Sequence, residues 1–228
     1  VAEYTEKNFN KFVMPDVITD MPSAAGMNDA DELYLAGVHV DQYRDPATNP
    51  DSYWKEALKR KINHIPSLIA MAKYELNRGC LDSAEDYVRR AIEAVTLFNE
   101  RVQSGEVYYT KARISEAKGD FDTAYDWYYK AYWAADCVGK AMTRIAMIDL
   151  RRKDYTEALR HAENALDYGR KNNLALLCLA LAKKETGDTD GAEKLLAEQL
   201  KKDSLDHYAG AYASLIKGET PEKAFYEG

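Results

Sequence analysis

The sequence predicts an all-α fold in which pairs of helices stack into an α-solenoid, and three observations lead to this prediction. Strong helix formers are abundant in the 228 residues, which contain only 12 Gly and 6 Pro. The phrase GDFDTAYDWYYKAY at residues 119–132 returns as KDYTEALRHAENAL at residues 153–166. This step of 34 residues is a spacing at which each repeat is one helix-turn-helix unit.

The first 64 residues are expected to form an extended lead-in and one irregular helical hairpin. Residues 1–30 contain three Pro or Gly breaks, which disfavour long helices there. In residues 31–64, DELYLAGVHVDQYRD and NPDSYWKEALKR read as two helices, the second with Asn49 as its cap and Pro50 at its first position. Because Pro50 stands where later units have alanine, these two helices are expected to cross differently.

Residues 65–202 are expected to hold about four regular units, with turns at Gly79, Gly119, Lys153 and Gly187. The first step between turns is 40 residues, so an insertion falls near residues 92–105. Alanine recurs seven residues before each turn residue, and again five and twelve residues after it. The positions are Ala72, Ala84 and Ala91, then Ala112, Ala124 and Ala131, then Ala146, Ala158 and Ala165, then Ala180, Ala192 and, breaking the pattern, Gln199.

The recurring alanines are explained by packing distance. A larger side chain at the closest point of two crossing helices would push their axes beyond the usual separation of about 8–10 Å. We therefore expect these alanines to be buried between paired helices. A glycine at the turn supplies the left-handed conformation that ends the first helix, and Asp82, Asp122 and Thr156 are expected to cap the second.

The last part of the chain, residues 203–228, is expected to form a capping helix and a tail. LDHYAGAYASLI reads as a helix that covers the final apolar face, and TPEKAFYEG as a further turn or two. Before it, LALLCLALA at residues 174–182 is apolar on nearly every side. Such a helix is either covered by its neighbours or presents a patch to a partner chain.

Residues 31–216 resemble a tetratricopeptide-repeat (TPR) array. More narrowly, QYRDPATNPDSYWKEALKR, the insertion TLFN before GEVYYTKA, YDWYYKAYW and DSLDHYA resemble a bacterial family. In that family such an array follows a large N-terminal region of unknown function with β-rich, sugar-mutarotase-like character. The resemblance implies a right-handed superhelix. It also implies that the chain, which begins at Val1, is the C-terminal helical part of a longer protein.

Composition and motifs argue against several classes of function. The net charge of −7 disfavours binding to nucleic acid or to an anionic membrane, and no apolar run is long enough to cross a bilayer. The three cysteines have wide spacings and form no C-x-x-C, so we expect a reducing, cytoplasmic location. No catalytic or cofactor motif is present, and we expect no catalytic residue, cofactor or metal.

Isolated chemistry-bearing residues are assigned structural or surface roles. No two of the histidines, His39, His64, His161 and His207, are three or four residues apart, which leaves a metal site without local partners. The aromatic cluster from Tyr125 to Trp133 is either core packing or a stacking platform, with Trp127 as the member expected to be exposed.

In stacked helix pairs the first helices line a concave side, and this is where we expect a binding groove. Its early part is basic and aromatic, and its later part is apolar. By repeat position, the candidate residues are His39, Ile69, Lys73, Asn77, Tyr109, Arg113, Thr143, Met147, Leu174, Leu177 and Leu181. Alternating pockets with a few charged anchors would suit an extended or helical peptide.

Two classes of function stay open. The first is a non-catalytic protein-interaction scaffold that binds a peptide, a partner protein or its own upstream domain. The second is an accessory helical region of a larger carbohydrate-related enzyme, contributing to access or oligomerisation. A stable homodimer through the face at residues 174–181 would favour a purely structural role.

Overall fold

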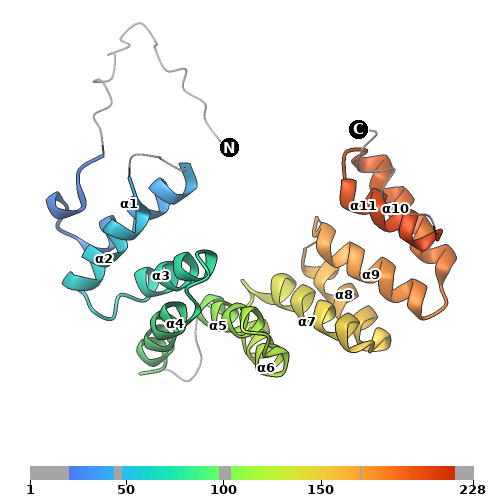
Figure 1. Ribbon diagram of the computed structural model, residues 1–228, viewed down its shortest axis with the longest axis horizontal. Coiled ribbons are helices and arrows are strands. Elements are labelled where there is room, and N and C mark those ends of the chain that lie inside the picture. Colours follow the sequence, from blue (N-terminus) through green and yellow to red (C-terminus); the bar gives the residue numbers. More distant parts are fainter. Residues whose placement is uncertain (1–20, 44–47, 98–103, 170, 219–228) are drawn as a thin grey trace, which may run out of the picture.

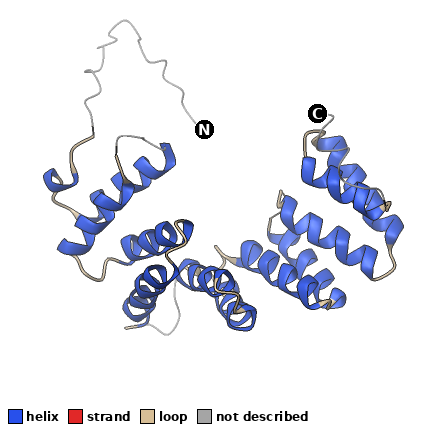
Figure 2. Ribbon diagram, in the orientation of Figure 1, coloured by secondary structure: helices blue, strands red, loops and turns tan. Residues whose placement is uncertain are grey.

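The computed structural model describes residues 21–43, 48–97, 104–169 and 171–218. Within these residues it contains eleven α-helices, a short 3₁₀ turn at Ala24–Gly26 and no strand (Figure 2). The helices are α1 Ala30–Tyr43, α2 Pro50–Arg60, α3 Ile65–Asn77, α4 Leu81–Thr96, α5 Glu106–Ala117, α6 Phe121–Tyr132, α7 Val138–Arg152, α8 Tyr155–Tyr168, α9 Asn173–Glu185, α10 Thr189–Lys202 and α11 His207–Ile216. The all-α prediction is therefore confirmed.

Helices pair in chain order, and the pairs stack into an arch (Figure 1). Each odd-numbered helix from α1 to α9 packs against the helix that follows it, and α11 packs against both α10 and α9. First helices of neighbouring units also contact one another, as in α1 with α3, α3 with α5, and α7 with α9. These contacts place the first helices on the inner side of the arch.

The recurring alanines lie in the buried core between the helices. All eleven of them have no solvent exposure, as the packing argument predicts. In the adjoining layers Leu68, Met71, Val88 and Tyr128 are also fully buried. The small side chain is therefore a requirement of the helix crossing, because the space around each alanine is already filled.

The turns within the four regular units share one backbone conformation. Gly79, Gly119 and Gly187 have φ of 77°, 81° and 96°, and Lys153 has φ of 63°. Lys153 is the only non-glycine residue with positive φ in the part of the chain that the structure describes. Its left-handed conformation confirms that it stands at the turn position, at a cost that glycine would not incur.

The expected caps of the second helices are wrong by two residues. Asp120, Asp154 and Asp188 are the N-caps of α6, α8 and α10, and their side chains accept hydrogen bonds from the backbone N–H groups of Thr123, Glu157 and Gly191. The second helix begins two residues after the left-handed residue, so the residue between them is the cap. In α4 that residue is Cys80, whose side chain makes no capping bond.

The irregular first unit crosses through a different pair of residues. Gly37 on α1 faces Trp54 on α2, and a Cβ at Gly37 would lie 2.4 Å from Nε1 of Trp54. That indole nitrogen donates to the carbonyl of Tyr34 at 3.2 Å. Here glycine and tryptophan replace the alanine pair, which explains why this unit departs from the alanine pattern.

Gln199 also departs from the alanine pattern, and it has a bonding partner. Its Nε2 donates to Oδ2 of Asp206 at 3.0 Å, while Oδ1 of Asp206 accepts from the N–H of Ala209 and caps α11. Asn173 of α9 donates to the same carboxylate at 3.0 Å. The carboxylate therefore joins the last regular unit to the helix that covers it.

Parts of the expectations fall outside the described residues. These are the lead-in over residues 1–20, the insertion over residues 98–103 and the turn after residue 218.

Candidate functional site

The inner side of the arch carries an apolar pocket of about 460 Å³ between α1, α2 and α3. Its wall includes the aromatic side chains of Tyr34, Trp54 and Tyr74 and the aliphatic side chains of Val38 and Ile69. The rings pack on one another, with Trp54 and Tyr74 in an edge-to-face contact at 6.1 Å. Because its walls come from helices, the pocket is held open by the fold.

A second pocket of about 320 Å³ follows on α3, α5 and α7. Three cationic side chains line it, those of Lys73, Arg113 and Lys140, against a single carboxylate, Glu106. Lys73, Asn77 and Glu106 line both pockets, so the two form one continuous groove. The groove changes from apolar to basic along its length, in a chain whose overall charge is −7.

Glu106 joins three inner helices where the two pockets meet. It is the first residue of α5, and it forms ion pairs with Lys73 of α3 and Lys140 of α7. Burial acts to raise the pKa of Glu106, but hydrogen bonds from Lys140 and Lys73 outweigh it and hold the pKa below its ordinary value. Conversely, although burial opposes it, the bond to Glu106 raises the pKa of Lys140. Glu106 and Lys140 are therefore both charged at neutral pH.

Five of the candidate residues line this groove: Ile69, Lys73, Asn77, Tyr109 and Arg113. His39 is exposed on α1 and stacks on Tyr43 with ring centroids 4.4 Å apart, but it lies outside both pockets. Sequence reasoning missed Glu106 and Lys140. The signal was available in the repeat, because the two residues are 34 positions apart and so occupy the same place in successive units.

The candidates in the later units line neither of these two pockets. Thr143 and Leu177 are buried, so in this structure they present little surface to a ligand. Thr143 instead accepts a hydrogen bond at 2.7 Å from Asn172, whose side chain also caps α9. Met147 and Leu181 are half-buried, and Leu174 is exposed at the start of α9.

The apolar helix α9 is mostly covered by its neighbours. Its buried residues include Ala175, Cys178, Leu179 and Ala180, and the helix packs against α7, α8, α10 and α11. Of the two explanations for its composition, coverage by adjacent units is therefore the correct one for most of its surface.

The central member of the aromatic cluster is part of the hydrophobic core. Tyr128 is fully buried, and the ring of Tyr109 lies 5.5 Å from it. Trp127, expected to be exposed, is half-buried against Tyr108 at 5.6 Å. Trp133 at the end of α6 is the exposed tryptophan instead, with 78% of its surface open to solvent. The helix ends at Tyr132, and Trp133 is its C-cap residue.

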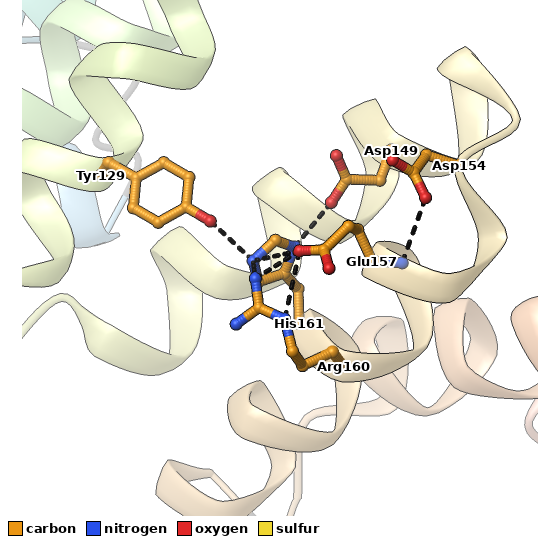
Figure 3. Close-up of polar contacts among 6 residues, drawn as sticks. All are labelled: Tyr129, Asp149, Asp154, Glu157, Arg160 and His161. Atoms are coloured by element: carbon orange, nitrogen blue, oxygen red, sulfur yellow. Dashed lines mark hydrogen bonds and ion pairs between the residues drawn. The ribbon is translucent and has the colours of Figure 1, made fainter.

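A polar network crosses α6, α7 and α8 (Figure 3). Nδ1 of His161 lies 2.6 Å from Oδ2 of Asp149, and Nε2 lies 2.7 Å from the hydroxyl of Tyr129. Because the Asp149 carboxylate accepts, Nδ1 carries the proton, and Nε2 lies 2.7 Å from both the Tyr129 hydroxyl and Nη2 of Arg160. Both His161 and Asp149 are buried. The network has a structural role, since it satisfies polar groups at a junction between units.

Three potential metal ligands, Glu106, Asp136 and Cys137, have donor atoms within 4.8 Å of one another. Each already has another role. Two lysines neutralise Glu106, and Asp136 accepts from Oγ of Ser104 at 2.6 Å and from the N–H of Gly105 at 3.1 Å. Burial raises the pKa of the Cys137 thiol to about 11. These contacts hold the start of α5 in place, and they argue against a metal site at these three residues.

No protein-family model matches the sequence, whereas solved structures share its fold. The chain is similar to YrrB, a TPR protein with an unusual peptide-binding site, at a TM-score of 0.59 and 17% identity, over 76% of this chain and 85% of that one. A tetratricopeptide repeat protein from Parabacteroides merdae gives a TM-score of 0.64 and 15% identity, covering 86% and 76%. PilF of Pseudomonas aeruginosa gives 0.70 and 12%, covering 82% of each chain.

These likenesses show the fold, a right-handed superhelical α-solenoid of TPR-like repeats. Across the described residues, none of the helices combines the length and apolar character that a membrane span requires.

Proposed function

We propose that this chain is a non-catalytic protein-interaction scaffold that binds a peptide segment of a partner in the groove over α1, α3, α5 and α7. One observation carries the proposal: an apolar pocket and a basic pocket are continuous on the inner helices. A peptide can place an apolar side chain in the first pocket and a charged one in the second.

The rigidity of the groove supports this function. The wall residues on α3 and α5 project from helices whose alanines, Ala72 and Ala112, have no solvent exposure. A preformed groove lowers the entropy cost of binding, because few protein side chains must be ordered by the ligand. The resemblance in fold to YrrB, described as having a peptide-binding site, agrees with this use of the inner surface.

The test is a selection from a random peptide library on the immobilised chain, followed by binding measurements on two variants. Ile69→Glu places a charge in the apolar pocket, and Tyr168→Ser removes an exposed aromatic side chain at the far end of α8. We expect selected peptides to lose binding to Ile69→Glu and to keep it on Tyr168→Ser.

Equal binding to both variants, or a selection that yields no peptide, would contradict the proposal. A parallel glycan array addresses the enzyme-accessory alternative, since sugar binding without peptide binding would favour it.

A further inference from the structure

In the basic pocket, a side chain of the protein itself already pairs with two of the cationic groups. Glu106 pairs with Lys73 through one carboxylate oxygen and with Lys140 through the other. It stands at the N-terminus of α5, where the helix dipole also favours a negative charge. Glu106 thus holds the place that a ligand carboxylate would take in the basic pocket.

The geometry points to Glu106 as an internal competitor: the partner peptide carries an acidic side chain that displaces Glu106 from Lys73 and Lys140, next to a large apolar side chain that fills the apolar pocket. This inference rests on the proposed function and names the chemistry of the peptide. The occupant is a side-chain carboxylate within a peptide segment, the same group that the lysines already hold.

Charge complementarity supports an acidic ligand. The basic pocket is lined by Lys73, Arg113 and Lys140 against Glu106 alone, so it retains an excess of positive charge even with Glu106 in place. The rest of the chain is acidic, which makes this the local exception to a net charge of −7. An acidic peptide would therefore be repelled by the chain in general and attracted to this pocket.

The apolar and acidic residues of the peptide must be neighbours, because the two pockets share part of their lining. Lys73 and Asn77 on α3 and Glu106 on α5 border both pockets. A ligand that replaces Glu106 therefore lies at the edge of the apolar pocket. One short segment with an apolar and an acidic residue side by side engages both pockets at once.

A peptide carboxylate can reach the two lysines and replace that of Glu106. The exposed fraction of the side chain is 24% for Glu106, 46% for Lys73 and 36% for Lys140, so water and ligand reach all three. One carboxylate replaces another, which leaves neither lysine unpaired. Net affinity then comes from burial of the apolar side chain, while the acidic residue provides selectivity.

The experiment measures peptide binding to wild-type protein, Glu106→Gln and a matched control, Glu85→Gln. Glu85 of α4 forms a similar ion pair with Lys111 of α5, and it lies outside both pockets. Each substitution removes one negative charge, so the control accounts for the change in net charge. Thermal melts followed by circular dichroism establish that the variants are folded.

The probes are short fluorescent peptides with both ends blocked, in a Gly/Ser background. One pool places Phe, Leu or Trp next to Glu, and the matched pool has Gln in place of Glu. A third pool has Gln and a free C-terminal carboxylate, which separates a terminal carboxylate from a side-chain one.

We expect Glu106→Gln to bind the blocked Glu pool about fivefold more tightly than wild type, because the peptide no longer has to displace a bridge worth about 1 kcal/mol. Glu85→Gln should match wild type, and the Gln pool should bind weakly to all three proteins. Even if Glu106→Gln fails to fold, rising salt should weaken the binding of the Glu pool to wild type and leave that of the Gln pool unchanged.

Failure of the inference and failure of the proposed function give different results. Equal affinity of wild type and Glu106→Gln for the Glu pool overturns the competitor role, while sensitivity to Ile69→Glu keeps the peptide-binding function. Binding of the free-carboxylate pool alone overturns the choice of a side-chain carboxylate. If no pool and no library peptide binds any of the proteins, the proposed function itself fails.

Discussion

His161 of α8 and Asp149 of α7 form a buried pair in which Nδ1 and Oδ2 are 2.6 Å apart. Both side chains are almost without solvent contact, and Tyr129 of α6 bonds to the other ring nitrogen. Three helices from two successive units therefore meet at one imidazole (Figure 3). The pair matters for the free energy of unfolding, because removing either side chain would leave the other buried without its hydrogen-bond partner.

Replacing His161 with Leu should lower the free energy of unfolding by about 2–4 kcal/mol, since it leaves the buried carboxylate of Asp149 unpaired. Urea denaturation followed by circular dichroism measures the change. His39→Leu is the matched control, because His39 is exposed, and its effect should stay within about 0.5 kcal/mol. An equal effect of both substitutions would show that the network does not stabilise the junction.

Two alanines of one helix should differ sharply in how much a larger side chain destabilises the fold. Ala112 is buried on α5 and Ala117 is exposed at its end. Ala112→Leu should destabilise the fold by about 1–3 kcal/mol because the helix crossing has no room for three further carbons. Ala117→Leu should change the free energy of unfolding by no more than about 0.5 kcal/mol. Similar melting temperatures for the two variants would contradict the packing argument.

The bridge at Glu106 predicts a pH dependence of stability. Since the two lysines hold the pKa of Glu106 below its ordinary value of 4.5, its ionised form stabilises the folded state above that value. This contribution is lost as the pH falls through the folded-state pKa. Wild type should therefore lose more stability than Glu106→Gln between about pH 5 and pH 3.

At neutral pH the same substitution should cost about 1 kcal/mol. Urea titrations at a series of pH values test both statements. Parallel stability curves for the two proteins would mean that the bridge contributes nothing to folding.

The three cysteines should differ in reactivity. Cys80 is exposed in the turn before α4, whereas Cys137 and Cys178 are buried, and burial raises the pKa of their thiols to about 11 and about 12. Because the thiolate is the reactive form, iodoacetamide at about pH 8 should modify Cys80 in the folded protein and the other two only after denaturation. Mass spectrometry of the digested protein distinguishes the sites. Modification of Cys137 as fast as Cys80 would contradict its burial.

Much of the fold follows from the sequence because its signals are local and repeat. The alanines identify the helix crossings, and the turn position identifies a left-handed residue even where Lys153 replaces glycine. Five groove residues could be placed from repeat position alone, since equivalent residues on stacked helices share a face.

The N-caps were harder to predict. Moving the start of a helix by two residues changes which side chain reaches the free N–H groups, but it leaves the spacing of the apolar residues unchanged. That shift moved the caps to Asp120 and Asp154.

By itself, the sequence determined the repeating helices, their closest contacts and the inner surface, because these depend on residue size and spacing along the chain. The tertiary structure alone decided which charges meet. Lys73, Glu106 and Lys140 lie on three different helices, and the buried Thr143 accepts a hydrogen bond from Asn172 of another unit. Such contacts depend on the rotation and offset between successive units, which spacing does not specify and which close packing of the whole array sets.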